Sequence, residues 1–135
     1  MPSTILVVDD DPVIQKLLAV NFEMEGYRVI TAGDGIEGIE RVQAEQPDLI
    51  LLDVMMPRMD GIAVVRTLKA DPVTAPIPVI LLSAKAQSTD INGGLDAGAD
   101  DYVTKPFDPL ELLDKVAALI GSPAGDDEPT SEAAR

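Results

Sequence analysis

The alternation of short aliphatic runs with longer segments of helical spacing is the feature that most constrains the fold of this chain. The runs cover residues 5–8, 28–31, 49–52, 79–82 and 101–103. This alternation predicts βα units, and therefore an α/β domain built on a parallel sheet. The first, third and fourth runs show no polar alternation, which is typical of central strands covered on both faces. The second and fifth runs are more polar, and we expect them at the edges of the sheet.

The segments between the runs predict helices. Apolar rows at helical spacing are formed by Val13, Leu17, Val20 and Met24, and by Leu110, Leu113, Ala117 and Ile120. We expect each row to be the buried face of a helix. Helix starts are predicted at four aspartates, because a carboxylate at this position accepts a hydrogen bond from the first helical turn. These aspartates are Asp11, Asp34, Asp60 and Asp108.

The segment 88–99 is the weakest helix in the pattern. Gly93 and Gly94 lie inside it, and each glycine costs up to about 1 kcal/mol relative to alanine in a helix. The two glycines read equally well as plain turn residues or as a hinge. From Gly121 onward the sequence is rich in Pro, Gly, Ser and acids, so we expect a single domain over residues 1–121 and a tail or the start of a linker over residues 122–135.

Composition restricts the chemistry. The 135 residues include no Cys and no His, so disulfides, thiolate metal sites and imidazole ligands are absent. The formal net charge of −14 argues against direct contact with nucleic acid or an anionic membrane surface. The sequence shows neither a signal-peptide pattern nor an apolar run of membrane-spanning length, and a cytoplasmic location is the default expectation.

Polar side chains follow the predicted central strands. Asp9 and Asp10 come after the first strand, Asp53 after the third and Ser83 after the fourth, while Lys105 lies just beyond the fifth. In an open parallel sheet, functional residues gather at the carboxyl ends of the strands. Carboxylates crowded together raise one another's pKa unless a cation joins them. An all-oxygen set of this size favours Mg²⁺, because Ca²⁺ takes more protein ligands.

These residues belong to motifs that resemble a known family. The segments LVVDDDP, LLDVMMPRMDG, LLSA and DYVTKPF occur in this order and are similar to those of receiver domains of two-component response regulators, including the chemotaxis regulators. The resemblance covers about residues 4 to 120. It implies a flavodoxin-like, doubly wound α/β fold with five parallel strands in the order 2-1-3-4-5 and helices on both faces.

The resemblance also assigns roles to residues. It implies that Asp53 accepts a phosphoryl group, and that Asp9, Asp10, Asp53 and the backbone carbonyl of Met55 hold Mg²⁺, with Mn²⁺ as an alternative ion. Lys105 is then expected to contact the phosphoryl oxygens, and Lys105–Pro106 to be a cis peptide bond. Ser83 and Tyr102 correspond to the switch residues of the family, although an aromatic residue on an edge strand is also ordinary packing.

The implied function is a phosphorylation-activated signalling switch and not an enzyme with turnover. Such a domain assists only its own phosphorylation and dephosphorylation. The expected donor is a histidine kinase or a histidine phosphotransfer protein, because this chain has no histidine. The expected output is a change in the face formed by the helix of 88–99, the strand of 101–103 and the helix that starts after Asp108. A downstream effector would bind that face, and the chain would be a monomer or a homodimer enhanced by phosphorylation.

Three alternatives belong to other classes. A pseudo-receiver that binds partners without phosphorylation would ordinarily lack one of the acids or the lysine, and this chain keeps them all. An aspartyl-phosphate hydrolase would carry a second acid two residues after its nucleophile, where this chain has Met55. A dinucleotide-binding domain would need a glycine-rich turn after the first strand, where this chain has DDDP.

Overall fold

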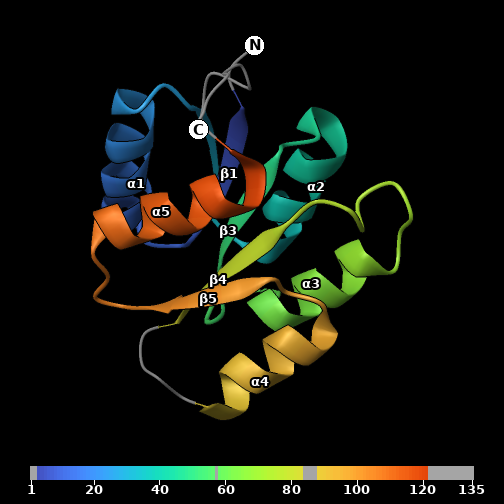
Figure 1. Ribbon diagram of the computed structural model, residues 1–135. Coiled ribbons are helices and arrows are strands. Elements are labelled where there is room, and N and C mark those ends of the chain that lie inside the picture. Colours follow the sequence, from blue (N-terminus) through green and yellow to red (C-terminus); the bar gives the residue numbers. More distant parts are fainter. Residues whose placement is uncertain (1–2, 57, 84–87, 122–135) are drawn as a thin grey trace.

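The fold is a five-stranded parallel sheet with helices on both faces, seen in a computed structural model that describes residues 3–56, 58–83 and 88–121. The strands are β1 (Thr4–Val8), β2 (Arg28–Ala32), β3 (Leu49–Asp53), β4 (Val79–Ser83) and β5 (Asp101–Thr104). Their order is β2-β1-β3-β4-β5, and every neighbouring pair is parallel (Figure 1). The predicted strands, their order and the two edges are confirmed.

Burial along the strands explains why these runs form the sheet. All residues of β3 and of β4 are buried, whereas β2 and β5 keep exposed or half-buried positions. A strand covered on both faces by helices needs a continuous apolar run, while an edge strand tolerates polar residues. Because all five strands run in the same direction, their carboxyl ends meet at one edge of the sheet.

Helices connect the strands. They are α1 (Pro12–Met24), α2 (Gly35–Glu45), α3 (Gly61–Lys69), α4 (Ser88–Ala97) and α5 (Pro109–Ile120). The four predicted starts are confirmed, because the side chains of Asp11, Asp34, Asp60 and Asp108 each accept a backbone N–H bond in the first turn of the following helix. These hydrogen bonds satisfy donors that have no partner within the helix.

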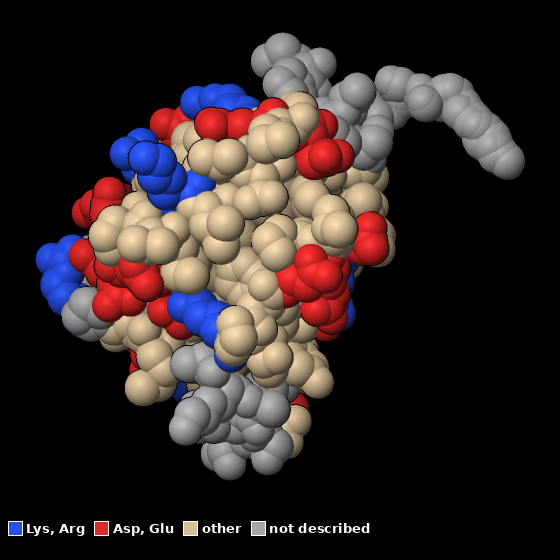
Figure 2. Space-filling view, turned by 90° about the vertical axis from the view of Figure 1, so that its left-hand side faces the viewer, with Lys and Arg blue, Asp and Glu red and all other residues tan. Residues whose placement is uncertain are grey.

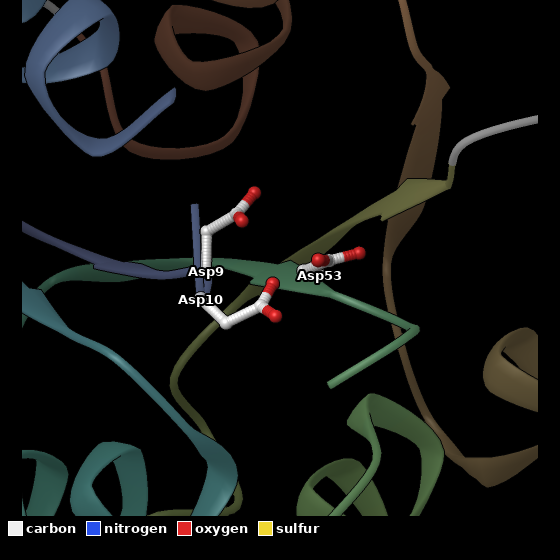
Figure 3. Close-up of side chains that lie close together, drawn as sticks. All are labelled: Asp9, Asp10 and Asp53. Atoms are coloured by element: carbon white, nitrogen blue, oxygen red, sulfur yellow. The ribbon is translucent and has the colours of Figure 1, made fainter. Parts of the chain in front are cut away.

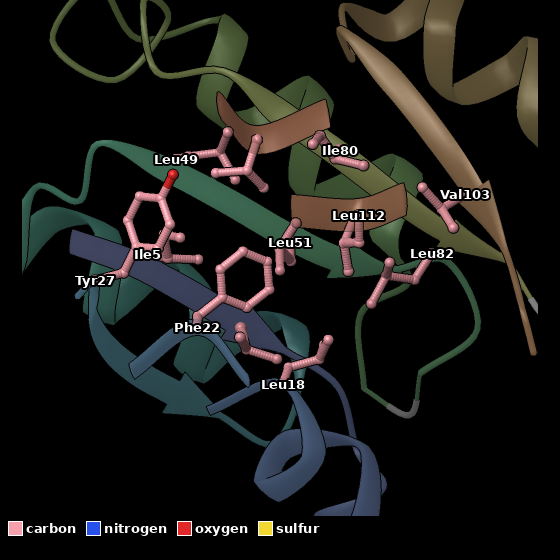
Figure 4. Close-up of a cluster of buried hydrophobic side chains, with 12 residues drawn as sticks. Ile5, Leu18, Phe22, Tyr27, Leu49, Leu51, Ile80, Leu82, Val103 and Leu112 are labelled. Atoms are coloured by element: carbon pink, nitrogen blue, oxygen red, sulfur yellow. The ribbon is translucent and has the colours of Figure 1, made fainter. Parts of the chain in front are cut away.

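The helices form two layers. Residues of α1 and α5 pack with the side of the sheet that carries Ile5, Leu51 and Leu82 (Figure 4). Residues of α2, α3 and α4 pack with the opposite side, which carries Leu6 and Leu52. Successive residues of a strand point to opposite faces, so one aliphatic run supplies both cores.

The prediction of which face of α1 is buried is wrong. Its four residues are exposed: Val13 by 71%, Leu17 by 40%, Val20 by 46% and Met24 by 78%. The core instead receives Leu18 and Phe22, both with no exposed area. The sequence holds two apolar rows on this helix, and the direction in which the chain leaves β1 decides which of them meets the sheet.

The predicted buried face of α5 is correct only in part. Leu113 and Ile120 are partly buried against the core, but Leu110 is 68% exposed and Ala117 is also exposed. The fully buried residues of this helix are Leu112 and Val116. The helix is therefore rotated by about one residue from the predicted orientation.

The two glycines of α4 are not turn residues, because the helix runs through both. Their role as a hinge stays a prediction. Gly94 is buried, and a Cβ atom placed on it would lie 2.1 Å from Cδ1 of Leu81. Glycine at this position therefore lets α4 lie close to β4. None of the helices in the described ranges is long and apolar enough to cross a membrane.

Candidate functional site

The carboxyl edge of the sheet brings three acids together. Asp9 and Asp10 follow β1, and Asp53 is the last residue of β3. One carboxylate oxygen from each lies within 4.8 Å of the others (Figure 3). Asp9 has no exposed area and Asp53 only 4%, whereas Asp10 is exposed. The cluster therefore has two acids buried in the protein and one open to solvent.

Lys105 completes the cluster. Its Nζ lies 2.7 Å from Oδ2 of Asp9 and 3.4 Å from Oδ2 of Asp53, and its side chain is 19% exposed. The backbone N–H of Lys105 donates to the carbonyl of Ser83, which ties the segment after β5 to the end of β4. The peptide bond between Lys105 and Pro106 is cis, as predicted.

The electrostatics of the cluster leave negative charge uncompensated. Burial first, and the Asp9 carboxylate second, raise the pKa of Asp53 to about 6 from its ordinary 3.8, although Lys105 and the backbone N–H of Met55 act in the opposite direction. Burial lowers the pKa of Lys105, but its hydrogen bond to Asp9 and the charge of Asp53 outweigh burial and raise it. The lysine therefore stays charged and still does not neutralise three carboxylates.

The donor set fits a small, hard divalent cation. Carboxylate oxygens are the ligands that Mg²⁺ and Mn²⁺ prefer, and Mg²⁺ keeps several waters when it binds. The exposed Asp10 provides a side from which a hydrated ion can enter. A cation at this cluster would also relieve the repulsion that raises the pKa of Asp53.

The two predicted switch residues lie on neighbouring strands and differ in exposure. Ser83 ends β4 and is 4% exposed, and its register partner in β5 is Thr104. Tyr102 lies in β5, two residues before Thr104, and is 38% exposed. The structure thus places the serine at the edge of the acid cluster and the tyrosine at the surface.

Gln15 is a contributor that the sequence reasoning missed. Its side-chain amide donates to the carbonyl of Asp9 at 2.6 Å and to the carbonyl of Ala32 at 3.2 Å. It therefore joins the end of β2 to the backbone of Asp9, one of the three acids. The signal for it in the sequence is weak, since it is one polar residue between Ile14 and Lys16.

Gly61 allows α3 to begin against the end of β3. A Cβ atom placed on Gly61 would lie 2.4 Å from the backbone oxygen of Asp53 and 2.9 Å from Cα of Val54. We expect Gly61→Ala to lower the free energy of unfolding by about 2 kcal/mol, because the backbone that carries Asp53 must shift. Urea unfolding monitored by circular dichroism measures this change.

Gly93→Ala is the matched control for this substitution. The nearest atom to its added Cβ would be Cδ1 of Ile62 at 3.3 Å, the end of a side chain rather than backbone. Alanine is also the better helix former, so this variant is expected to be neutral or stabilising by up to about 1 kcal/mol. Equal destabilisation by the two variants would contradict the proposed close approach at Gly61.

Comparison with known proteins identifies a family. Residues 5–117 match the family model described as "Response regulator receiver domain". The chain is 51% identical over 116 residues to the DNA-binding dual master transcriptional regulator RpaA of Synechocystis sp., covering 86% of this chain and 48% of RpaA. It is 43% identical over 129 residues to the DNA-binding response regulator MtrA of Mycolicibacterium smegmatis, covering 96% of this chain and 54% of MtrA. The chain thus spans about half the length of these relatives.

A solved structure with the same fold carries a metal. The receiver domain of the sensor histidine kinase PA1611 from Pseudomonas aeruginosa PAO1, with a magnesium ion coordinated in its active site cleft, matches with a TM-score of 0.83 at 34% identity. The match covers 90% of this chain and 100% of that domain.

Proposed function

Because this chain belongs to the response regulator receiver domain family of two-component systems, we propose that Asp53 accepts a phosphoryl group from a phosphohistidine. The observation that carries this proposal is the placement of Asp53, which is 4% exposed, within reach of the two other acids and 3.4 Å from the ammonium of Lys105. A carboxylate is a poor nucleophile toward an anionic phosphoryl group unless positive charge is fixed beside it. The cluster provides that charge in two forms, an ammonium and a site for a divalent cation.

Asp9, Asp10, Asp53 and the backbone carbonyl of Met55 are the proposed holders of Mg²⁺, with Mn²⁺ as an alternative. When bound, the ion supplies positive charge that polarises the phosphoryl oxygens and offsets the negative charge developed during transfer. Support comes from the three converging carboxylates and from the magnesium ion named in the related receiver domain.

In the proposed transfer, a carboxylate oxygen of Asp53 forms a bond to phosphorus while the bond from phosphorus to the donor's imidazole nitrogen breaks. The electron pair of the broken bond stays on the imidazole. Lys105 directs its ammonium at the oxygens of the incoming group, since its Nζ already lies 3.4 Å from Oδ2 of Asp53. The product is an acyl phosphate on Asp53, so the chain acts as an acceptor and not as a turnover enzyme.

The added phosphoryl group gives the switch its signal. We expect the hydroxyl of Ser83, at the buried end of β4, to donate to a phosphoryl oxygen that exists only after transfer. The exposed Tyr102 then turns inward, and the face formed by α4, β5 and α5 changes shape for a downstream effector or a second copy. The relatives named as DNA-binding are about twice as long as this chain. Because this chain carries a formal net charge of −14, we propose that it does not itself contact DNA. We also propose that it works in the cytoplasm.

The exposed row of α1 is the proposed contact surface for the phosphoryl donor. An open groove of about 550 Å³ along it is lined by Pro12, Val13, Lys16, Leu17, Val20 and Asn21. Figure 2 shows this side of the molecule, where uncharged residues form a continuous area framed by charged groups. The helix starts at Pro12, directly after the acids, so a helical protein that brings a phosphohistidine to Asp53 can also cover this row.

We expect Leu17→Glu to slow transfer from a phosphorylated histidine kinase by about tenfold, because a carboxylate replaces an apolar side chain that lines the groove. Transfer from acetyl phosphate, which needs no docking surface, is expected to be unchanged. The matched control on the same helix is Glu23→Gln, which is exposed and does not line the groove. Equal slowing with both donors would contradict the docking role.

Beryllofluoride, which mimics a phosphoryl group, tests the proposed function without a donor protein. With Mg²⁺ present, fluorine NMR is expected to show a bound beryllofluoride signal that disappears when the metal is chelated. Absence of a bound beryllofluoride signal with Mg²⁺ present would contradict the proposed function.

A further inference from the structure

Arg58 forms a forked ion pair that joins two loops. Its Nη2 lies 2.6 Å, and its Nε 3.1 Å, from the same oxygen, Oδ2 of Asp34. Arg58 belongs to the segment between β3 and α3, and Asp34 is the residue at which α2 starts. The other oxygen of Asp34 accepts from the backbone N–H of Glu37 at 2.9 Å. One oxygen of this carboxylate therefore caps α2, and the other accepts from Arg58.

The backbone at Arg58 is held in an unfavourable conformation. Its φ angle is 68°, in the left-handed region where glycine is at home and other side chains are uncommon. A glycine would satisfy a simple turn at this position better than an arginine. Strain of this kind persists only where the surroundings hold it in place. The ion pair with Asp34 is a contact of Arg58 that can do so.

Close backbone packing makes the loop a short connection between α2 and the acid cluster. A Cβ atom on Gly35 would lie 2.3 Å from the backbone oxygen of Met59, so the start of α2 rests on the residue next to Arg58. At the other end of the loop, the N–H of Gly61 donates to the carbonyl of Val54 at 2.9 Å. The described part of this loop, from Arg58 to Gly61, therefore contacts the start of α2 at Met59 and the residue after Asp53 at Gly61.

The loop also contacts Asp53 directly. The backbone N–H of Met55 lies 3.2 Å from Oδ1 of Asp53, and the carbonyl of Met55 is the proposed fourth ligand of the metal. On the other side of the cluster, Gln15 bonds to the carbonyls of both Asp9 and Ala32. Both ligand-bearing segments are thus bonded to the region where β2 ends and α2 begins, through Ala32 on one side and Asp34 on the other. This region carries no proposed ligand itself.

We infer that Arg58 and Asp34 are positioning residues, which hold the β3–α3 loop in the conformation that presents Met55 and Asp53 to a divalent cation. This inference rests on the proposed function, because it concerns the same metal site. It adds a role for the end of β2 and the turn after it, residues 32–34, which would anchor the metal site from outside.

Arg58→Gly separates this role from a purely structural one. Glycine removes the ion pair and relieves the backbone, so the free energy of unfolding is expected to stay level or rise. Mg²⁺ affinity, measured by calorimetry on the full chain, is expected to fall by about two- to fivefold, the range given by the loss of an exposed ion pair. In the metal-free protein, NMR is expected to show faster exchange of the Met55 and Gly61 amide protons.

Asp34→Asn tests the pair from its other side, since asparagine still starts a helix but lacks the charge. A long-range charge effect predicts tighter Mg²⁺ binding for Arg58→Gly and weaker binding for Asp34→Asn. The positioning role predicts weaker binding for both variants, and a double variant no weaker than the single ones. The control is Arg41→Gln, which removes another exposed arginine pair on α2 and is expected to leave Mg²⁺ affinity unchanged.

The outcomes distinguish two failures. Wild-type protein that binds neither Mg²⁺ nor beryllofluoride would overturn the proposed function. Wild-type protein that binds both, with Arg58→Gly and Asp34→Asn matching it in Mg²⁺ affinity and amide exchange, would overturn only the positioning role.

Discussion

Asp53→Asn is expected to abolish phosphoryl uptake and, in metal-free protein at pH 7, to raise the free energy of unfolding by about 2 kcal/mol. Asparagine has the shape of aspartate but carries no charge, so it cannot attack phosphorus. It also removes a carboxylate that is 4% exposed beside the fully buried Asp9. The charged carboxylate that makes Asp53 an acceptor is thus expected to lower the free energy of unfolding as long as no cation is bound.

The gain in the free energy of unfolding from Asp53→Asn is expected to depend on pH. Because the pKa of Asp53 is raised from 3.8 to about 6, the folded protein holds the proton more tightly than the unfolded chain. The stability that comes from the protonated group is complete below pH 3.8 and is lost as the pH rises through about 6. The difference between Asp53→Asn and wild type is therefore expected to be near zero at low pH and full at pH 7.

Urea unfolding with a chelator present, at several pH values between these limits, measures the difference. Asp114→Asn is the matched control, because Asp114 is exposed on α5, and it is expected to show no pH-dependent gain. A gain for Asp53→Asn that stays constant from low pH to pH 7 would mean that charge burial is not its source.

Lys105→Met is expected to have the largest destabilising effect, lowering the free energy of unfolding by about 3 kcal/mol in the absence of a divalent ion. The substitution leaves Asp9 and Asp53 buried without the ammonium that lies 2.7 Å and 3.4 Å from their oxygens. Phosphoryl uptake from acetyl phosphate is expected to slow by at least about a hundredfold, because a fixed charge at the transferring oxygens is lost.

Lys115→Met is the matched control for this substitution. Lys115 also pairs with an aspartate, Asp101, at 3.0 Å, but the side chains are 29% and 36% exposed, more than that of Lys105 at 19%. An exposed pair of this kind is worth less than about 1 kcal/mol. Similar losses for Lys105→Met and Lys115→Met would show that burial of the acid cluster is not what makes Lys105 important.

The sheet and the helix starts could be predicted because each depends on residues that are close together in the sequence. Runs such as residues 49–52 are continuous aliphatic segments, and only buried central strands need such segments in an α/β domain. Aspartates before helices mark helix starts by a hydrogen bond within one turn. The acid cluster followed from the sheet, since residues after parallel strands meet at one edge.

The orientation of the helices could not be predicted in the same way. On α1, Val13 and Leu17 have the same spacing as Ile14 and Leu18, and spacing alone does not say which pair faces the sheet. The outcome depends on how the chain leaves β1 and on contacts with α5. The same holds for Arg58 and Asp34, whose pairing across 24 positions leaves no local trace in the sequence.

The most direct test of the central claim is the mass spectrum of the protein after incubation with acetyl phosphate and Mg²⁺. We expect the intact mass to increase by one phosphoryl group, peptide mapping to place that group on Asp53, and the increase to vanish in Asp53→Asn or when the metal is chelated. No increase for wild type, or a phosphoryl group mapped to another residue, would contradict the account.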